Sequence, residues 1–146
     1  MKKYRGLWLL FFVVSCFIPC YAHHMAVVVN VENPAQDISA ADLAKIFKAQ
    51  TTRWPDGRSV VLVLQGTSGE TVTLQRLNKM TPARWRAFLE EHKTSIVIAN
   101  SDAAVLKQIE SNKGAIALVE FHSITSKIKV LKVGGQLPLE EGYLPH

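Results

Sequence analysis

A short polar segment at residues 65–71 carries the side chains best suited to bind a small anion. It reads Gln-Gly-Thr-Ser-Gly-Glu-Thr and follows an uninterrupted apolar run at residues 60–64. The apolar spacing at residues 72–77 is that of a helix. A loop at the N-terminus of a helix presents unpaired backbone N–H groups, which attract anions. The candidate ligand-binding residues are Gln65, Thr67, Ser68, Gly69, Glu70 and Thr71.

The same segment also has the spacing of a helix that caps itself. Glu70 lies three residues after Thr67, which is the spacing of a capping box. In that motif the Thr side chain accepts the backbone N–H of the Glu, and the Glu side chain accepts the backbone N–H of the Thr. A loop satisfied in this way needs no ligand, and a fixed carboxylate repels phosphate. An anion site and a self-capped helix start both remain open interpretations.

Catalytic and metal-binding patterns are not recognisable in the sequence. The five histidines, at positions 23, 24, 92, 122 and 146, form no triad and no metal-ligand spacing. Ser68 lies in Thr-Ser-Gly-Glu, which differs from the Gly-x-Ser-x-Gly nucleophile motif. We therefore expect no enzyme activity, no metal site and no cofactor.

Residues 1–22 have the organisation of a secretory signal peptide. A basic start precedes an apolar stretch at residues 7–18, and the small Ala22 precedes the polar His23. The apolar stretch is shorter than the about 20 residues of a comfortable membrane span. We expect cleavage after Ala22 and no membrane span after processing. One alternative is a lipoprotein, because Val-Val-Ser-Cys resembles a lipidation signal that would modify Cys16.

The processed chain should be a single domain of low charge. Removing Lys2, Lys3 and Arg5 from the 17 basic residues leaves 14 against 12 acidic residues, a net charge of +2. This charge is too weak to indicate nucleic-acid or membrane binding. Both cysteines also leave with the signal peptide, so no disulfide is expected.

Alternating apolar segments predict an α/β fold, with a largely parallel sheet flanked by helices. Strands are expected at residues 26–31, 60–64, 95–99, 115–119 and 128–133. Helices are expected after the capping residues Ser39, Thr81 and Ser101 and over residues 68–80, with Gly114 ending the last helix. The predicted domain covers residues 23–135, and residues 136–146 are expected to form a loosely held C-terminal tail.

Residues 38–47, the turn around Trp54 and residues 112–119 form an ordered set of motifs. In this order they resemble the second lobe of the periplasmic phosphate-binding proteins of ABC transporters, where residues 112–119 correspond to the family's Pro-Gly-Ala-Ile-Gly-Tyr strand. Between them, residues 65–71 stand where the family has an Arg-x-x-x-Ser-Gly-Thr loop that grips phosphate. The resemblance implies one lobe of a type II periplasmic-binding-protein-like fold, a periplasmic location and a role in phosphate transport.

Two departures from the family pattern affect the expected function. The family has two lobes with ligand between them, whereas this chain is long enough for one lobe only, so half of the usual contacts are missing. In the loop, Gln65 and Glu70 replace the family Arg and Thr, and only Ser68 and Gly69 are kept. A charge-assisted hydrogen bond is worth about 1.5–3 kcal/mol, so losing the Arg weakens phosphate binding by roughly ten- to a hundredfold.

Two functions follow from these observations. The first is an exported module that binds phosphate or another small oxyanion weakly, with a homodimer or a periplasmic protein partner supplying the missing lobe. The alternative is a periplasmic protein-interaction or sensor-input module that has lost ligand binding. Trp54 and the tail near Tyr143 are candidate contact regions for such a module.

Overall fold

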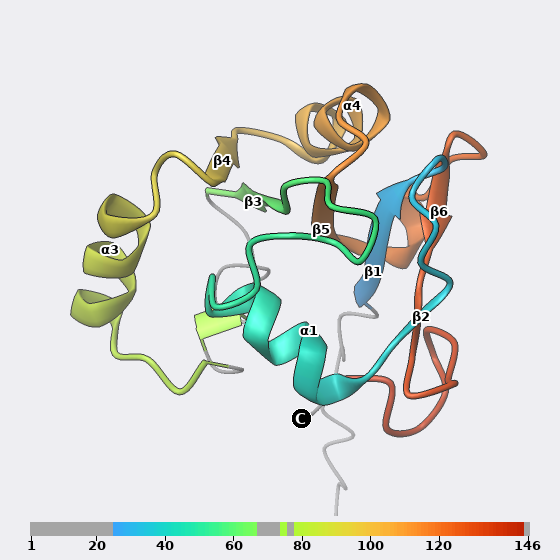
Figure 1. Ribbon diagram of the computed structural model, residues 1–146, viewed down its shortest axis with the longest axis horizontal. Coiled ribbons are helices and arrows are strands. Elements are labelled where there is room, and N and C mark those ends of the chain that lie inside the picture. The colour runs from blue at the N-terminus through green and yellow to red at the C-terminus, as the bar shows by residue number, and fades with distance from the viewer. Residues whose placement is uncertain (1–24, 67–73, 76–77, 145–146) are drawn as a thin grey trace, which may run out of the picture.

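The computed structural model describes residues 25–66, 74–75 and 78–144. Among these residues, five strands form one sheet in the order β4-β3-β5-β1-β6 (Figure 1). The strands are β1 (Met25–Asn30), β3 (Val61–Gln65), β4 (Ile96–Ala99), β5 (Ala115–Glu120) and β6 (Ile128–Val130). β3 pairs in parallel with β4 and β5, and β1 pairs antiparallel with β5 and β6. Only β1 therefore runs against the other four strands, which confirms the predicted largely parallel sheet.

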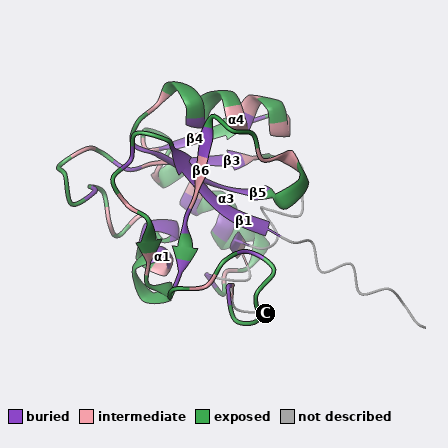
Figure 2. Cartoon of the chain, turned by 90° about the vertical axis from the view of Figure 1, so that its right-hand side faces the viewer, coloured by how far each residue is buried: buried purple, intermediate pink, exposed green. Residues whose placement is uncertain are grey.

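Helices cover both faces of this sheet. The helices α1 (Ala40–Phe47) and α3 (Pro82–Glu91) pack on one face, and α4 (Asp102–Ser111) packs on the other. Side chains alternate accordingly, because Leu62 and Leu64 contact the α1 and α3 side while Val63 contacts the α4 side. The strands are consequently buried along most of their length (Figure 2), as expected for a sheet covered on both faces.

The three predicted helix caps are confirmed. The side-chain oxygens of Ser39, Thr81 and Ser101 each accept the backbone N–H of the residue three positions later. Pro82 occupies the first turn of α3, where its missing N–H costs nothing. Local sequence signals thus determine where these helices begin. Among the described residues, no helix is both long and apolar enough to span a bilayer.

Gly114 has a different role from the predicted one. α4 already ends at Ser111, and the glycine lies buried directly before β5. A Cβ atom at this position would collide with the carbonyl oxygen of Ser59. The carbonyl oxygen of Gly114 also accepts hydrogen bonds from Trp54 Nε1 at 2.9 Å and from the Val61 N–H at 3.1 Å. Glycine is needed here for close backbone approach rather than to end the helix.

The single strand predicted at residues 128–133 is wrong, because the structure has two strands there. β6 belongs to the main sheet, whereas β7 (Lys132–Val133) pairs in parallel with β2 (Asp37–Ile38) in a separate two-stranded sheet. The chain leaves the main sheet at Leu131, whose N–H still bonds to the carbonyl oxygen of Val27. An apolar run does not reveal such a change of sheet, because both strands bury apolar residues.

The C-terminal segment is anchored rather than loosely held. Tyr143 is buried, and its hydroxyl accepts the Val27 N–H at 2.9 Å and donates to the Leu131 carbonyl oxygen at 2.8 Å. The hydroxyl therefore bridges β1 and the chain that leaves β6. Burial raises the pKa of Tyr143 to about 12, because an ionised phenol would lose its water.

Candidate functional site

The carboxyl ends of β3 and β4 form the position in this fold that best suits a ligand. Gln65 and Ala99 are partners at the ends of these strands, and the Gly66 N–H donates to the Ala99 carbonyl oxygen at 3.0 Å. The chain after β3 leads to Leu74 and α3 on one face, whereas the chain after β4 leads to α4 on the other. Open α/β sheets bind ligands where the connections diverge in this way.

Only part of the predicted loop lies within the described residues. Gln65 is the last residue of β3 and is half-buried. The exposed Gly66 follows and lies close to Ile98, because a Cβ atom added to Gly66 would be 3.0 Å from Ile98 Cγ2. The other candidate residues lie outside the described residues and stay predictions: Thr67, Ser68, Gly69, Glu70 and Thr71. The predicted helix at 68–80 is described in part, and residues 74–75 are helical. Residues 78–79 form a turn and Lys79 has a φ of 51°, so the predicted end of the helix at residue 80 is wrong.

The neighbouring strand brings polar groups that the sequence did not single out as site residues. Asn100 is exposed directly after β4, and Ser101 and Asp102 begin α4. The Asp102 carboxylate accepts a hydrogen bond from the Ser123 hydroxyl at 3.4 Å. A buried strand followed by small polar residues and a helix is the same pattern that marked residues 65–71, so a comparison of the two segments would have found this one.

The electrostatics of this edge do not favour a strongly bound anion. We define the carboxyl edge as residues 65–66, 99–102 and 120–123. These ranges begin at the last residues of the adjacent parallel strands β3, β4 and β5. This set contains the carboxylates of Asp102 and Glu120 and contains no lysine or arginine. An anion bound by these residues would depend on backbone N–H, amide, hydroxyl and imidazole donors, which lack the forked charged grip of a guanidinium group on phosphate.

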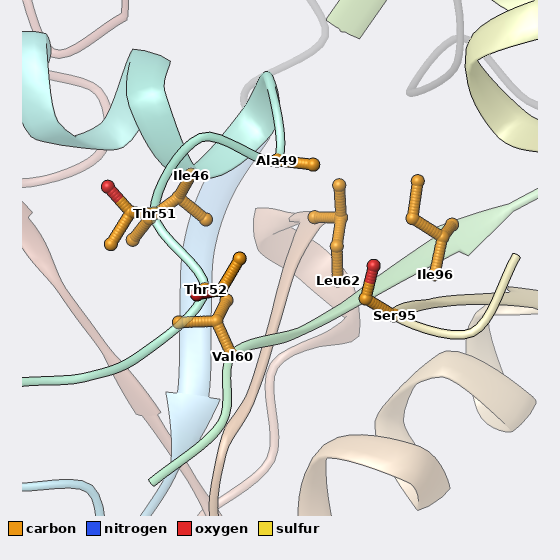
Figure 3. A pocket seen from close by; sticks show the side chains of 8 residues that line it. All are labelled: Ile46, Ala49, Thr51, Thr52, Val60, Leu62, Ser95 and Ile96. Carbon is orange, nitrogen blue, oxygen red and sulfur yellow. The ribbon is translucent and has the colours of Figure 1, made fainter. Parts of the chain in front are cut away.

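A small pocket lies at the opposite end of the strands, under the C-terminus of α1 (Figure 3). Its lining residues are Ile46, Ala49, Thr51, Thr52, Val60, Leu62, Ser95 and Ile96. The cavity volume is about 10 Å³, which is room for about one water molecule. This pocket is therefore too small for phosphate and lies away from the carboxyl edge.

Three further predictions were compared with the described residues. No group of three or more His, Cys, Asp or Glu side chains in this part of the chain is placed to hold a metal. Trp54 and Tyr143 are only 5% and 4% exposed. Both side chains serve internal packing and hydrogen bonding, so neither forms a contact surface, and partner contact through the tail near Tyr143 stays a prediction.

Comparison with known proteins identifies one family and a set of similar folds. The model of the PBP superfamily domain matches residues 16–142. An ABC-type phosphate transport receptor from Vibrio cholerae has a TM-score of 0.64 at 19% identity, over 79% of this chain and 48% of that one. A putative phosphate ABC transporter substrate-binding protein from Clostridium perfringens, solved with bound phosphate, has a TM-score of 0.64 at 20% identity. The match covers 77% of this chain and 45% of that one.

A phosphate-binding protein from Stenotrophomonas maltophilia is also similar, with a TM-score of 0.58 at 17% identity over 80% of this chain and 40% of that one. At these identities the likeness concerns the fold alone. The chain spans less than half the length of each of these three structures. A search of curated proteins gave no significant match.

Proposed function

Because the chain belongs to the PBP superfamily domain family, we propose that it is an exported single-lobe module that binds phosphate or a similar oxyanion weakly. The observation that carries this proposal is the divergence of connections at the carboxyl ends of β3 and β4, where open α/β sheets bind ligands. The similar solved structures from Vibrio cholerae and Clostridium perfringens are a phosphate transport receptor and a putative phosphate ABC transporter substrate-binding protein, which supports the choice of ligand class.

The proposed site combines donors from two adjacent strands. The backbone N–H groups and hydroxyls of residues 67–71 would face the anion from the β3 side, with the amide of Gln65 beside them. Asn100 and Ser101 stand on the β4 side. The absence of lysine and arginine from the described part of this edge, together with Asp102 and Glu120, accounts for the weakness of the proposed binding.

A second lobe would complete this site. The chain covers less than half of the similar phosphate-binding structures, and the described domain would contact the ligand from one side. We propose that a second copy or a periplasmic protein partner closes the other side, and that the module reaches the periplasm through the signal peptide at residues 1–22. In this proposal the module does not transport phosphate alone.

Calorimetric titration with phosphate at near-neutral pH and low salt, with sulfate as the competing anion, tests the site. Gln65→Arg should tighten phosphate binding by roughly ten- to a hundredfold, because it restores a charged and forked donor. Ser68→Ala should weaken binding, whereas Ser111→Ala is the matched control, since Ser111 lies at the far end of α4. If neither the natural chain nor Gln65→Arg binds millimolar phosphate, the oxyanion proposal is wrong.

The second candidate function is a protein-interaction or sensor-input module without a ligand. It is favoured by the composition of the carboxyl edge, where Phe121 is 41% exposed beside the carboxylates of Asp102 and Glu120. Phosphate binding by Gln65→Arg, with none by the natural chain, would support this candidate. That result would indicate a retained site architecture from which the binding residue has been lost.

A further inference from the structure

The C-terminal segment contains a turn with an unusual residue at its third position. The Glu140 N–H donates to the Leu137 carbonyl oxygen at 3.1 Å, which closes a four-residue turn. Pro138 fixes its own φ near −65°, and Leu139 has a φ of 77°. These two values are those of a type II turn, whose third position normally holds glycine because φ is positive there.

Nearby turns show that glycine is the usual solution in this segment. Gly134 and Gly135 have φ values of 59° and 83°, and Gly142 has a φ of 83°. Leu139 is the one non-glycine residue with a positive φ in the described residues after position 133. Its backbone is strained, because the Cβ atom of an L-residue crowds the chain in this conformation.

The apolar side chains of this turn remain largely exposed to solvent. The side chain of Leu139 is 57% exposed and that of Leu137 is 47% exposed. The turn is nevertheless held firmly, because the Glu140 carboxylate accepts the Leu137 N–H at 2.6 Å and the Glu140 carbonyl oxygen accepts the N–H of the buried Tyr143. The structure therefore presents two apolar side chains to solvent on a braced turn.

We propose that this apolar turn, residues 137–140, is a contact surface for a second copy of the chain. Charge favours this partner. The C-terminal segment from residue 134 onward contains Glu140 and Glu141 and no lysine or arginine. All 14 basic residues of the processed chain precede it, along with the other 10 acidic residues. The turn of one copy is thus complementary to the body of another.

The surface that we assign to this turn is the small pocket beside the C-terminus of α1 (Figure 3). Its floor is apolar, and its mouth includes the half-exposed Ala49 and the exposed Thr52. The exposed Lys48 and Arg53 adjoin Ala49 and Thr52 in the chain and provide positive charge for the carboxylates of Glu140 and Glu141. The pocket accepts a methyl group rather than a whole side chain, so the contact is shallow and weak.

Because the turn and the pocket are different surfaces, each copy carries both halves of the contact. This contact is separate from the carboxyl edge, and its test is independent of phosphate. Sedimentation velocity of the processed chain, residues 23–146, over a range of concentrations measures it. We expect self-association that weakens as salt increases, because the charges that support it are exposed.

Leu139→Gly gives the decisive comparison, because glycine suits the turn while removing the apolar side chain. The variant should have a dissociation constant at least about tenfold higher, with unfolding in urea at the same or a higher midpoint. Thr52→Glu, which places a carboxylate at the pocket mouth, should weaken association similarly. Val31→Ser, at an exposed apolar residue elsewhere, should leave association unchanged.

Three results would overturn the proposal. A chain that stays monomeric at all accessible concentrations has no such contact. Self-association that Leu139→Gly leaves unchanged does not use the turn. Self-association that is weakened by Leu139→Gly and not by Thr52→Glu does not use the pocket.

Discussion

Replacing Gly114 with alanine should destabilise the domain strongly, because the new methyl group would collide with the carbonyl oxygen of Ser59. The two backbones must separate to make room, and the hydrogen bonds of Trp54 Nε1 and the Val61 N–H to the Gly114 carbonyl oxygen would stretch or break. Each buried group left without a partner costs about 1–3 kcal/mol. We therefore expect a loss of about 3 kcal/mol or more, a large part of the roughly 5–15 kcal/mol of a typical domain.

Urea unfolding followed by tryptophan fluorescence measures this loss. Gly57→Ala is the matched control, because no atom lies within 4 Å of its added Cβ and its φ of 87° leaves backbone strain as the cost. That cost should be about 1–2 kcal/mol. The reasoning is refuted if Gly114→Ala destabilises the domain no more than Gly57→Ala does, since the collision with Ser59 would then be relieved without breaking any contact.

Further predictions concern the C-terminal anchor and a helix cap. Tyr143→Phe should lower the free energy of unfolding by about 2–4 kcal/mol, because the Val27 N–H and the Leu131 carbonyl oxygen lose their shared partner; a loss below about 0.5 kcal/mol would contradict the bridge. Because the folded-state pKa of Tyr143 is raised from 10.0 to about 12, its contribution is complete below pH 10 and is lost as the pH rises toward 12. Denaturant melts across this range should show the decline in the natural chain and less of it in Tyr143→Phe. Ser101→Ala should cost about 1 kcal/mol in the same melts through loss of the α4 cap, whereas the exposed Ser111→Ala should change stability by less than about 0.5 kcal/mol.

Local signals in the sequence predicted where the helices begin. They could not predict contacts between residues that are distant in the chain. Ser39, Thr81 and Ser101 act within three residues of their own positions, so their capping roles were readable from the sequence. The anchor of the C-terminal segment joins Tyr143 to a residue 116 positions away. Composition at the C-terminus suggested a loose tail, because a single hydroxyl between two backbones leaves no pattern in the sequence.

The candidate site was predictable on one strand and not on the other. Gln65 was found because a polar segment follows an apolar run. Asn100 was missed because its relevance depends on β4 lying beside β3 and on α4 lying on the opposite face from α3. Strand order and the choice of face arise from packing of the whole domain, which neither segment specifies alone.

The hydrogen bond between Tyr143 and Val27 brings the two ends of the described domain together, since Val27 lies two residues after the start of β1. Neighbouring ends are the condition under which a domain tolerates circular permutation. A short linker from residue 144 to residue 25 would preserve the order of strands in the sheet. New ends could then be opened at the exposed turn of residues 55–57, which would give a rearranged chain with the same fold.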